Sequence, residues 1–139
     1  MSFEIVKAFY GKLRSDSTFN TGLGGSASSA GRIFEALAPD GAAYPLCTFN
    51  LVTMDRDARF TSTGVDSDFN FRVDLYDRRT VSTETLYSLS DKLITLMHKA
   101  SFAITDNGTG ESLVTSDGQL LIEDEFNRIS HNILVLCGP

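Results

Sequence analysis

Two histidines are the first residues whose type could do chemistry in this 139-residue chain. A catalytic imidazole needs a nucleophile and an orienting acid within reach, and a metal-binding imidazole needs further ligands at close spacing. His98 and His131 have no such neighbours in the sequence. His98 closes a helical pattern, where a positive charge complements the helix dipole. His131 stands in an expected strand and keeps a second interpretation open, a small-ligand-binding or hydrolytic α+β domain that uses this imidazole and nearby carboxylates.

Two pairs of aspartates in a polar segment could bind a cation, because hard metals prefer several carboxylates. They are Asp55 with Asp57 and Asp66 with Asp68. The calcium-loop pattern of alternating acids, central glycine and terminal glutamate is missing, which favours a solvated charged loop. The glycines at 22, 24 and 25 lack the Lys-Ser/Thr that follows a phosphate-binding loop, and the nucleophile-elbow pattern is absent. The sequence therefore predicts no enzyme, no metal and no cofactor.

Composition and charge indicate one globular domain. Hydrophobic residues make up 42% and charged residues 22%, close to the globular average. The net charge of -6 argues against non-specific nucleic-acid binding, which requires neutralised phosphates, but is compatible with a channel through which DNA passes without binding. Cys47 and Cys137 lie in apolar runs and are expected to be buried free thiols. No leader and no membrane-length apolar run is visible, so we expect a protein made in the cytosol.

Hydrophobic periodicity predicts two helices and several strands. Helical spacing of apolar residues covers 2–14 and 82–100. Strand-like segments are 32–36, 46–53, 69–76, 102–105, 119–122 and 126–136. This order indicates an α+β fold, a mostly antiparallel sheet with two main helices packed on one face, in a single domain spanning 1–139.

The connections carry their own predictions. Residues 15–31 are rich in glycine and serine and predict a long connection of the kind that is usually mobile, either functional or disordered in the isolated chain. Pro39 and Pro45 are expected to bracket a chain reversal and to set the register of the next strand. Residues 105–118 have the composition of turns, and residues 54–68 predict either a loop or the solvated tip of a long hairpin.

Taken in order, these elements resemble the tail terminator family of tailed bacteriophages, whose members are also called tail-completion or head-tail joining proteins. The matching segments are Phe9-Tyr10, Leu13, Ser15-Asp16, Leu23–Gly25, Gly31–Phe34, APDGAAYPLCTFNLV at 38–52, Phe71–Tyr76, Leu86–Met97 and DEFNRISHNILVL at 124–136. The resemblance spans nearly the whole chain and its motifs are architectural. Residues 26–30 depart from the pattern, since the link in this sequence is longer than is usual in the family.

The resemblance implies a small structural subunit of the virion tail or neck, assembled in the host cytoplasm. Six copies would form a ring that caps the tail tube, ends tail polymerisation and joins the tail to the head or neck. The implied partners are further copies of the chain, the tail tube protein and the head-tail connector or stopper protein. Genomic DNA would pass through the ring, with no sequence-specific nucleic acid bound and no membrane. The alternative from the same class is a head-side connector or stopper ring of that neck.

Charged residues are expected to form the subunit or tube interface, because charge pairs fix the register of an interface more than its affinity. The candidates are Asp55, Arg56, Asp57, Arg59, Asp66 and Asp68, together with Arg78 and Arg79 just before the second helix. For each group the alternative is a loop that is merely solvated.

Overall fold

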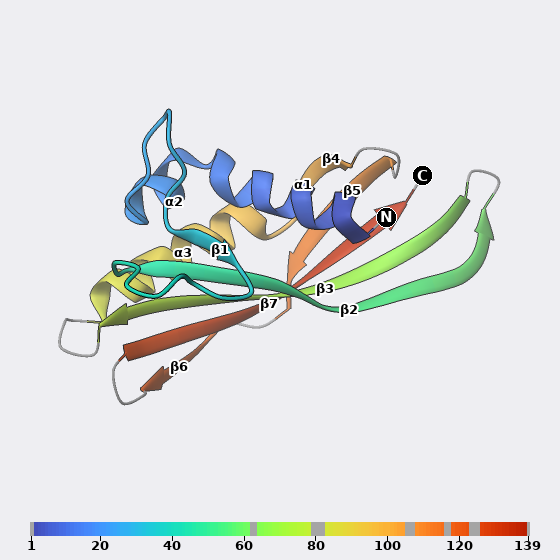
Figure 1. Ribbon diagram of the computed structural model, residues 1–139. Helices are drawn as coiled ribbons and strands as arrows, with labels where there is room; N and C mark the ends of the chain where they lie inside the picture. Colours follow the sequence, from blue (N-terminus) through green and yellow to red (C-terminus); the bar gives the residue numbers. More distant parts are fainter. Residues whose placement is uncertain are drawn as a thin grey trace.

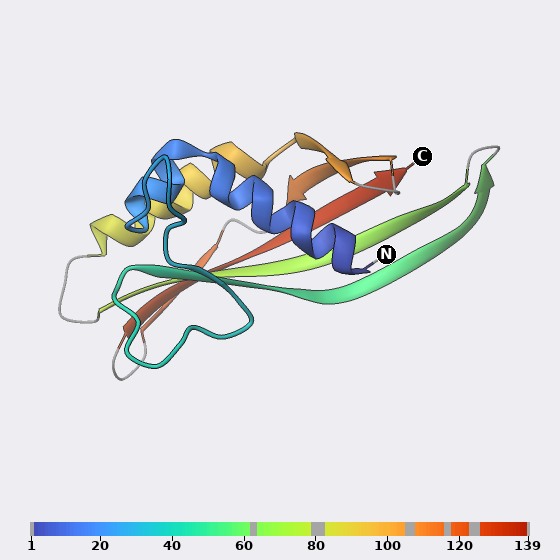
Figure 2. The same cartoon turned by 45° about the horizontal axis from the view of Figure 1, so that its top comes forward.

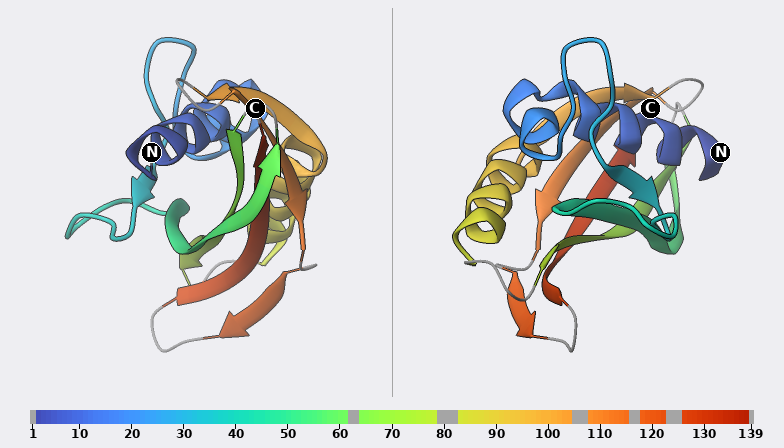
Figure 3. Two further views of the ribbon diagram at one scale, coloured as in Figure 1. Left: turned by 90° about the vertical axis from the view of Figure 1, so that its right-hand side faces the viewer. Right: turned by 60° about the vertical axis from the view of Figure 1, so that its left-hand side comes forward.

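The structure, a computed structural model, describes residues 2–61, 64–78, 83–104, 108–115, 118–122 and 126–138. The elements are α1 (Ser2–Ser15), α2 (Ser17–Gly22), β1 (Ile33–Glu35), β2 (Leu46–Thr61), β3 (Gly64–Arg78), α3 (Glu84–Met97), β4 (Ala100–Ile104), β5 (Gly108–Val114), β6 (Gln119–Ile122) and β7 (Phe126–Gly138). All described strands join one curled sheet, and the helices cover one of its faces (Figures 1 and 3). The predicted α+β fold is confirmed.

Strand β3 lies at the centre of the sheet and carries the core. It pairs with β2 on one side and with β7 on the other, antiparallel in both cases. Its odd-numbered residues from Phe69 to Leu75 are all buried and face the helices, as their alternation predicts. The Phe9 ring of α1 stacks on Phe71 at 4.0 Å between ring centroids, and this contact seats the helix on the sheet.

The two long helices follow the predicted periodicity. Helix α1 buries Ile5, Phe9 and Leu13, which recur every fourth residue and therefore lie on one face. Helix α3 buries four apolar residues at the same kind of spacing: Leu86, Leu89, Leu93 and Met97. It ends three residues before the expected limit, because Lys99 adopts a left-handed φ of 58° and Ala100 begins β4.

Residues 15–31 were expected to form a long connection, and the structure instead places a short helix in its first part. Asp16 caps a six-residue helix, α2, by accepting hydrogen bonds from the backbone N–H groups of Thr18 and Phe19. The loop that follows is fixed by the buried side chain of Asn20. Its Nδ2 donates to the carbonyl oxygens of Ser26 and Ser29, each at 3.1 Å, and its Oδ1 accepts from the N–H of Gly31 at 2.6 Å.

Residues 105–118 were expected to form turns, and this is wrong for most of the described part. Gly108–Val114 form β5, which lies between β4 and β7. Glycine has a poor strand propensity, but two flanking strands supply the hydrogen bonds that local sequence does not favour. Strands β5 and β6 pair with successive parts of the same edge of β7, from Gly138 to Ile133 and from Ser130 to Asn127.

The proline-flanked segment 36–45 joins two parallel strands. The expected turn is present, since the N–H of Ala42 donates to the Pro39 carbonyl at 3.1 Å. However, β1 and β2 run parallel, so the segment carries the chain back along the sheet instead of closing a hairpin (Figure 2). Arg32 fixes the register, because its Nε donates to the Pro45 carbonyl at 2.7 Å. The Tyr44–Pro45 peptide bond is cis.

We predict that Asn20→Ala destabilises the chain by about 2–4 kcal/mol, because a buried side chain loses three hydrogen bonds to the loop. Urea unfolding followed by circular dichroism measures the change. Ser28→Ala is the matched control in the same loop, where the side chain is exposed and a change within about 0.5 kcal/mol is expected. Equal stability of the two variants would show that Asn20 does not hold the loop.

The Cys47 thiol is expected to be unreactive in the folded chain. Burial, and to a smaller extent the charge of Asp74, raises the pKa of this thiol far above its ordinary value. The raised pKa contributes stability below the ordinary thiol pKa, and this contribution is lost as the pH rises above it toward the folded value. In a Cys137→Ser background, we expect no reaction with an aromatic disulfide reagent at a pH of about 8 and one equivalent after denaturation. Rapid labelling of the native chain would contradict the buried position.

Candidate assembly surface

Strands β2 and β3 continue past the rest of the sheet as a two-stranded hairpin. Strand β1 pairs with β2 only from Cys47 to Phe49, and β7 pairs with β3 only from Ser67 to Arg78. We call residues 54–61 and 64–68 the arm. Figures 1 and 2 show the arm extending beyond the N-terminal end of α1, away from the helical layer. The expectation of a long hairpin is therefore confirmed, and that of a loop is not.

The arm holds six of the eight residues predicted at an interface. They are Asp55, Arg56, Asp57 and Arg59 on β2 and Asp66 and Asp68 on β3. Within the arm, Asp55 lies directly opposite Asp68 in the strand register. Like charges at opposed positions of an antiparallel pair are destabilising. The arm has four aspartates and two arginines, a net charge of -2, and is thus suited to a positively charged partner.

The other two predicted residues do not lie on the arm. Arg78 is exposed at the opposite end of β3, ten residues from Asp68, which is about 33 Å along a strand. Arg79 lies outside the described residues. The predicted residues therefore belong to two separate regions, and the structure gives no common surface that contains both.

The outer edge of β2 is open beyond β1. The last contact on this side is the hydrogen bond from the Ala36 N–H to the Phe49 carbonyl, at 2.8 Å. Beyond it, no described strand pairs with the outer edge of β2. Leu37 and Val52 lie near this point with 83% and 54% of their surface exposed. Unpaired backbone groups beside exposed apolar side chains can accept a strand from another chain.

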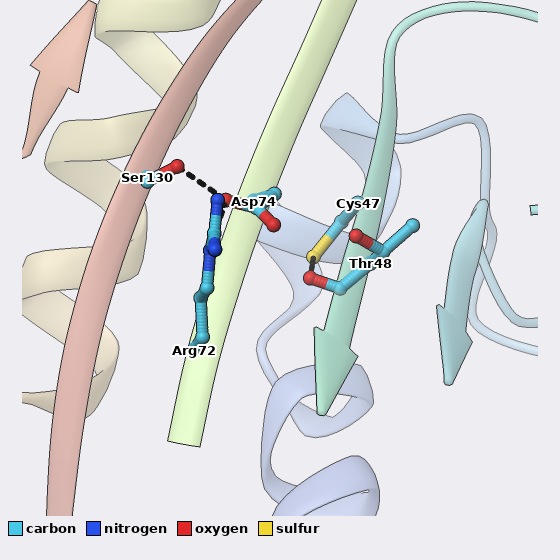
Figure 4. A network of polar contacts seen from close by, with 5 residues as sticks. All are labelled: Cys47, Thr48, Arg72, Asp74 and Ser130. Carbon is cyan, nitrogen blue, oxygen red and sulfur yellow. Dashed lines mark hydrogen bonds and ion pairs between the residues drawn. The ribbon is translucent and has the colours of Figure 1, made fainter. Parts of the chain in front are cut away.

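A polar cluster lies on the face of the sheet opposite the helices (Figure 4). The buried Asp74 carboxylate accepts hydrogen bonds from Ser130 Oγ on β7 and from Arg72 Nε, the latter at 3.2 Å. Asp74 and Ser130 are also register partners, so the cluster ties β3 to β7. The carboxylate is paired with Arg72 and hydrogen-bonded to Ser130, so the cluster joins neighbouring strands.

His131 lies inside the core. Its Nε2 is 2.7 Å from Ser90 Oγ on α3, and the two side chains are 0% and 6% exposed. A serine–histidine pair must reach its substrate to catalyse hydrolysis. This pair is covered by the helix and the sheet and joins one to the other. Among the described residues, no group of three or more His, Cys, Asp and Glu is placed to hold a metal ion, and none of the described helices is long and apolar enough to cross a membrane.

An open groove of about 800 Å³ lies between α1 and the loop after α2, and we call it the α1 groove. Its lining residues are Lys7, Tyr10, Gly11, Arg14, Ser15, Ser17, Asn20, Thr21, Ser26 and Ala27. The sequence did not predict this groove. The available signal was the spacing of Lys7, Gly11 and Arg14, which places them on one helix face. The opposing wall is the loop that Asn20 holds by its hydrogen bonds. No motif or spacing in the sequence indicated the position of this loop.

The fold is shared with solved structures of very different sequence. A chain of the virion of a native gene transfer agent particle matches with a TM-score of 0.73 and 13% identity, over 96% of this chain and 93% of that one. A second solved chain matches with a TM-score of 0.70 and 12% identity, over 100% of this chain and 96% of that one. No protein-family model matches the sequence, and no curated protein does. At these identities the likeness shows the fold.

We predict that the backbone amides of the arm exchange rapidly in the isolated subunit and become protected on assembly. Apart from Ser67 and Asp68, which pair with β7, the arm has no third strand on either side among the described residues, and a lone two-stranded hairpin is marginally stable in water. Hydrogen exchange with mass spectrometry measures this, and the amides of Phe71 and Val73 serve as internal controls that stay protected. Strong protection of the arm in a monomer would contradict the prediction.

Proposed function

We propose that this chain is a structural subunit of a phage-like particle, where it forms a ring that caps the tail tube, ends tail polymerisation and joins the tail to the head or neck. The observation that carries the proposal is the shared fold with a chain of a gene transfer agent virion, which extends over nearly the full length of both chains. The sequence resemblance to tail terminators supports the same class of protein independently of that match.

The surfaces of the chain support assembly through unlike faces. A closed ring needs a heterologous interface, in which one region of each copy meets a different region of the next. The arm and the open edge of β2 belong to the sheet, whereas the α1 groove belongs to the helical layer. Such directional surfaces are what a ring-forming subunit requires, and no ligand chemistry is needed for the role.

A head-side connector or stopper ring of the same neck is the alternative, because such a ring also acts through surfaces alone. The two roles differ in their binding partner. Purified protein that binds tail tubes but not portal-bearing heads supports the terminator role, and the reverse preference supports the stopper role.

Deleting the gene from the phage that carries it tests the proposal. Negative-stain images of the lysate are expected to show unjoined heads and headless tails, with tubes grown to irregular lengths, because nothing would stop tube polymerisation. Tails of normal length beside DNA-filled heads that fail to join would move the protein to the head side. Ordinary infectious particles would overturn both structural roles and return attention to an enzyme.

A further inference from the structure

Gly11 is an unusual residue for its position in the α1 groove. It lies in the middle of a 14-residue helix and is exposed, where glycine lowers helix stability relative to alanine. A Cβ placed on it would meet no described atom within 4 Å, so no contact within the described part of the chain requires its small size. A glycine that the chain's own packing does not require suits a surface that another backbone approaches closely.

The groove around Gly11 is positively charged. Lys7 and Arg14 lie one turn to either side of Gly11, and both are exposed. None of the described residues that line the groove is acidic, so Lys7 and Arg14 give this lining a charge of +2. Neither cation forms an ion pair with a described residue. Opposite charge on a partner would therefore be attracted to this face, because neither cation has to give up an ion pair within the described part of the chain before docking.

The arm supplies the opposite charge. Its aspartates outnumber its arginines, and Asp55 and Asp68 oppose each other in the register, which a nearby cation would relieve. Lys7 and Arg14 are about 10 Å apart along the helix axis, whereas the opposed acids Asp55 and Asp68 are about 5 Å apart. The long side chains of Lys7 and Arg14 would therefore have to bend toward each other over Gly11 to contact both acids.

The arm does not reach the groove of its own chain. It extends past the N-terminal end of α1, whereas the groove runs toward the other end of α1, beside α2 (Figures 1 and 2). Closing that distance within one chain would require bending the arm back across the helical layer. The pairing therefore fits two copies.

We propose that the acidic arm of one copy docks in the α1 groove of the next copy, with Asp55 and Asp68 facing Lys7 and Arg14 across Gly11. The inference rests on the ring in the proposed function and names the contact that would hold it. The arm and the groove are different regions of the chain, so each copy uses both, and the contact repeats head to tail until the ring closes.

Charge reversal on each side tests the contact. We expect Arg14→Glu to weaken assembly about tenfold or more, measured as the concentration at which light scattering reports half-assembled protein. Lys12→Glu is the matched control, since it makes the same charge change in the same last turn of α1 but lies outside the groove lining. The paired change Asp55→Arg with Asp68→Arg is expected to weaken assembly to the same degree.

Mixing the two charge-reversed chains gives the decisive result. The Arg14→Glu chain retains its arm and the other variant retains its groove, so together they are expected to form at least a dimer of two 15.2-kDa chains, about 30 kDa, and larger alternating species where the reversed arm also docks in the reversed groove. Failure of the mixture to dimerise under conditions in which the unaltered chain assembles would overturn the contact.

Gly11→Gln separates docking from folding. Glutamine favours the helix more than glycine does, so we expect a higher melting temperature of the subunit together with loss of assembly. A folding defect cannot give that combination. Normal rings from Gly11→Gln or from Arg14→Glu would overturn the docking while leaving the proposed function intact.

A zero-length carbodiimide cross-linker extends the test to the unaltered chain, since it joins a lysine amine directly to a carboxylate. Peptides that link Lys7 to Asp55 or Asp68, with one peptide from an isotope-labelled copy, are the expected product. If the unaltered chain stays monomeric and gives no such peptide, the docking fails, and the gene-deletion images then decide the proposed function separately.

Discussion

The structure depends on one constraint, the burial of a single face of β3 at the centre of the sheet. Side chains alternate along a strand, so the residues from Phe69 to Leu75 can meet the helices only if β2 and β7 hold β3 in one register. A slip by one residue would turn Phe71 and Val73 toward solvent and bring Arg72 and Asp74 under the helices. The stack of Phe9 on Phe71 extends the same constraint to α1.

This register also decides what the chain can offer to a partner. Because β2 and β3 remain paired beyond the strands that flank them, the excess length becomes an arm and not part of the core. The like-charged positions Asp55 and Asp68 are brought together by that pairing. The helices, held on one face by the core, turn the polar face of α1 outward with Lys7 and Arg14 on it. Surfaces of opposite charge thus lie in different parts of one subunit, as a head-to-tail assembly needs.

The elements that the sequence predicted are those in which apolar side chains recur with the period of a helix or a strand. Helix α1, helix α3 and the buried face of β3 follow directly from the spacing of apolar residues. The elements that were missed, α2 and β5, are rich in serine, threonine and glycine, and their local preferences favour turns. Asn20 and the flanking strands β4 and β7 hold these segments in place, and such contacts join residues far apart in the chain. Of the candidate site, the charged residues of the arm were identified, but the groove was not.

The sequence by itself determined the fold class, the buried faces and the number and sign of the charged residues. These follow from side-chain type and from the spacing at which apolar residues recur. Only the tertiary structure decided where those charges meet. Register placed Asp55 opposite Asp68, the Asn20 hydrogen bonds built the second wall of the α1 groove, and the length of β2 and β3 carried the arm away from its own groove. Each of these depends on contacts between segments distant in sequence, and one segment read alone does not encode them.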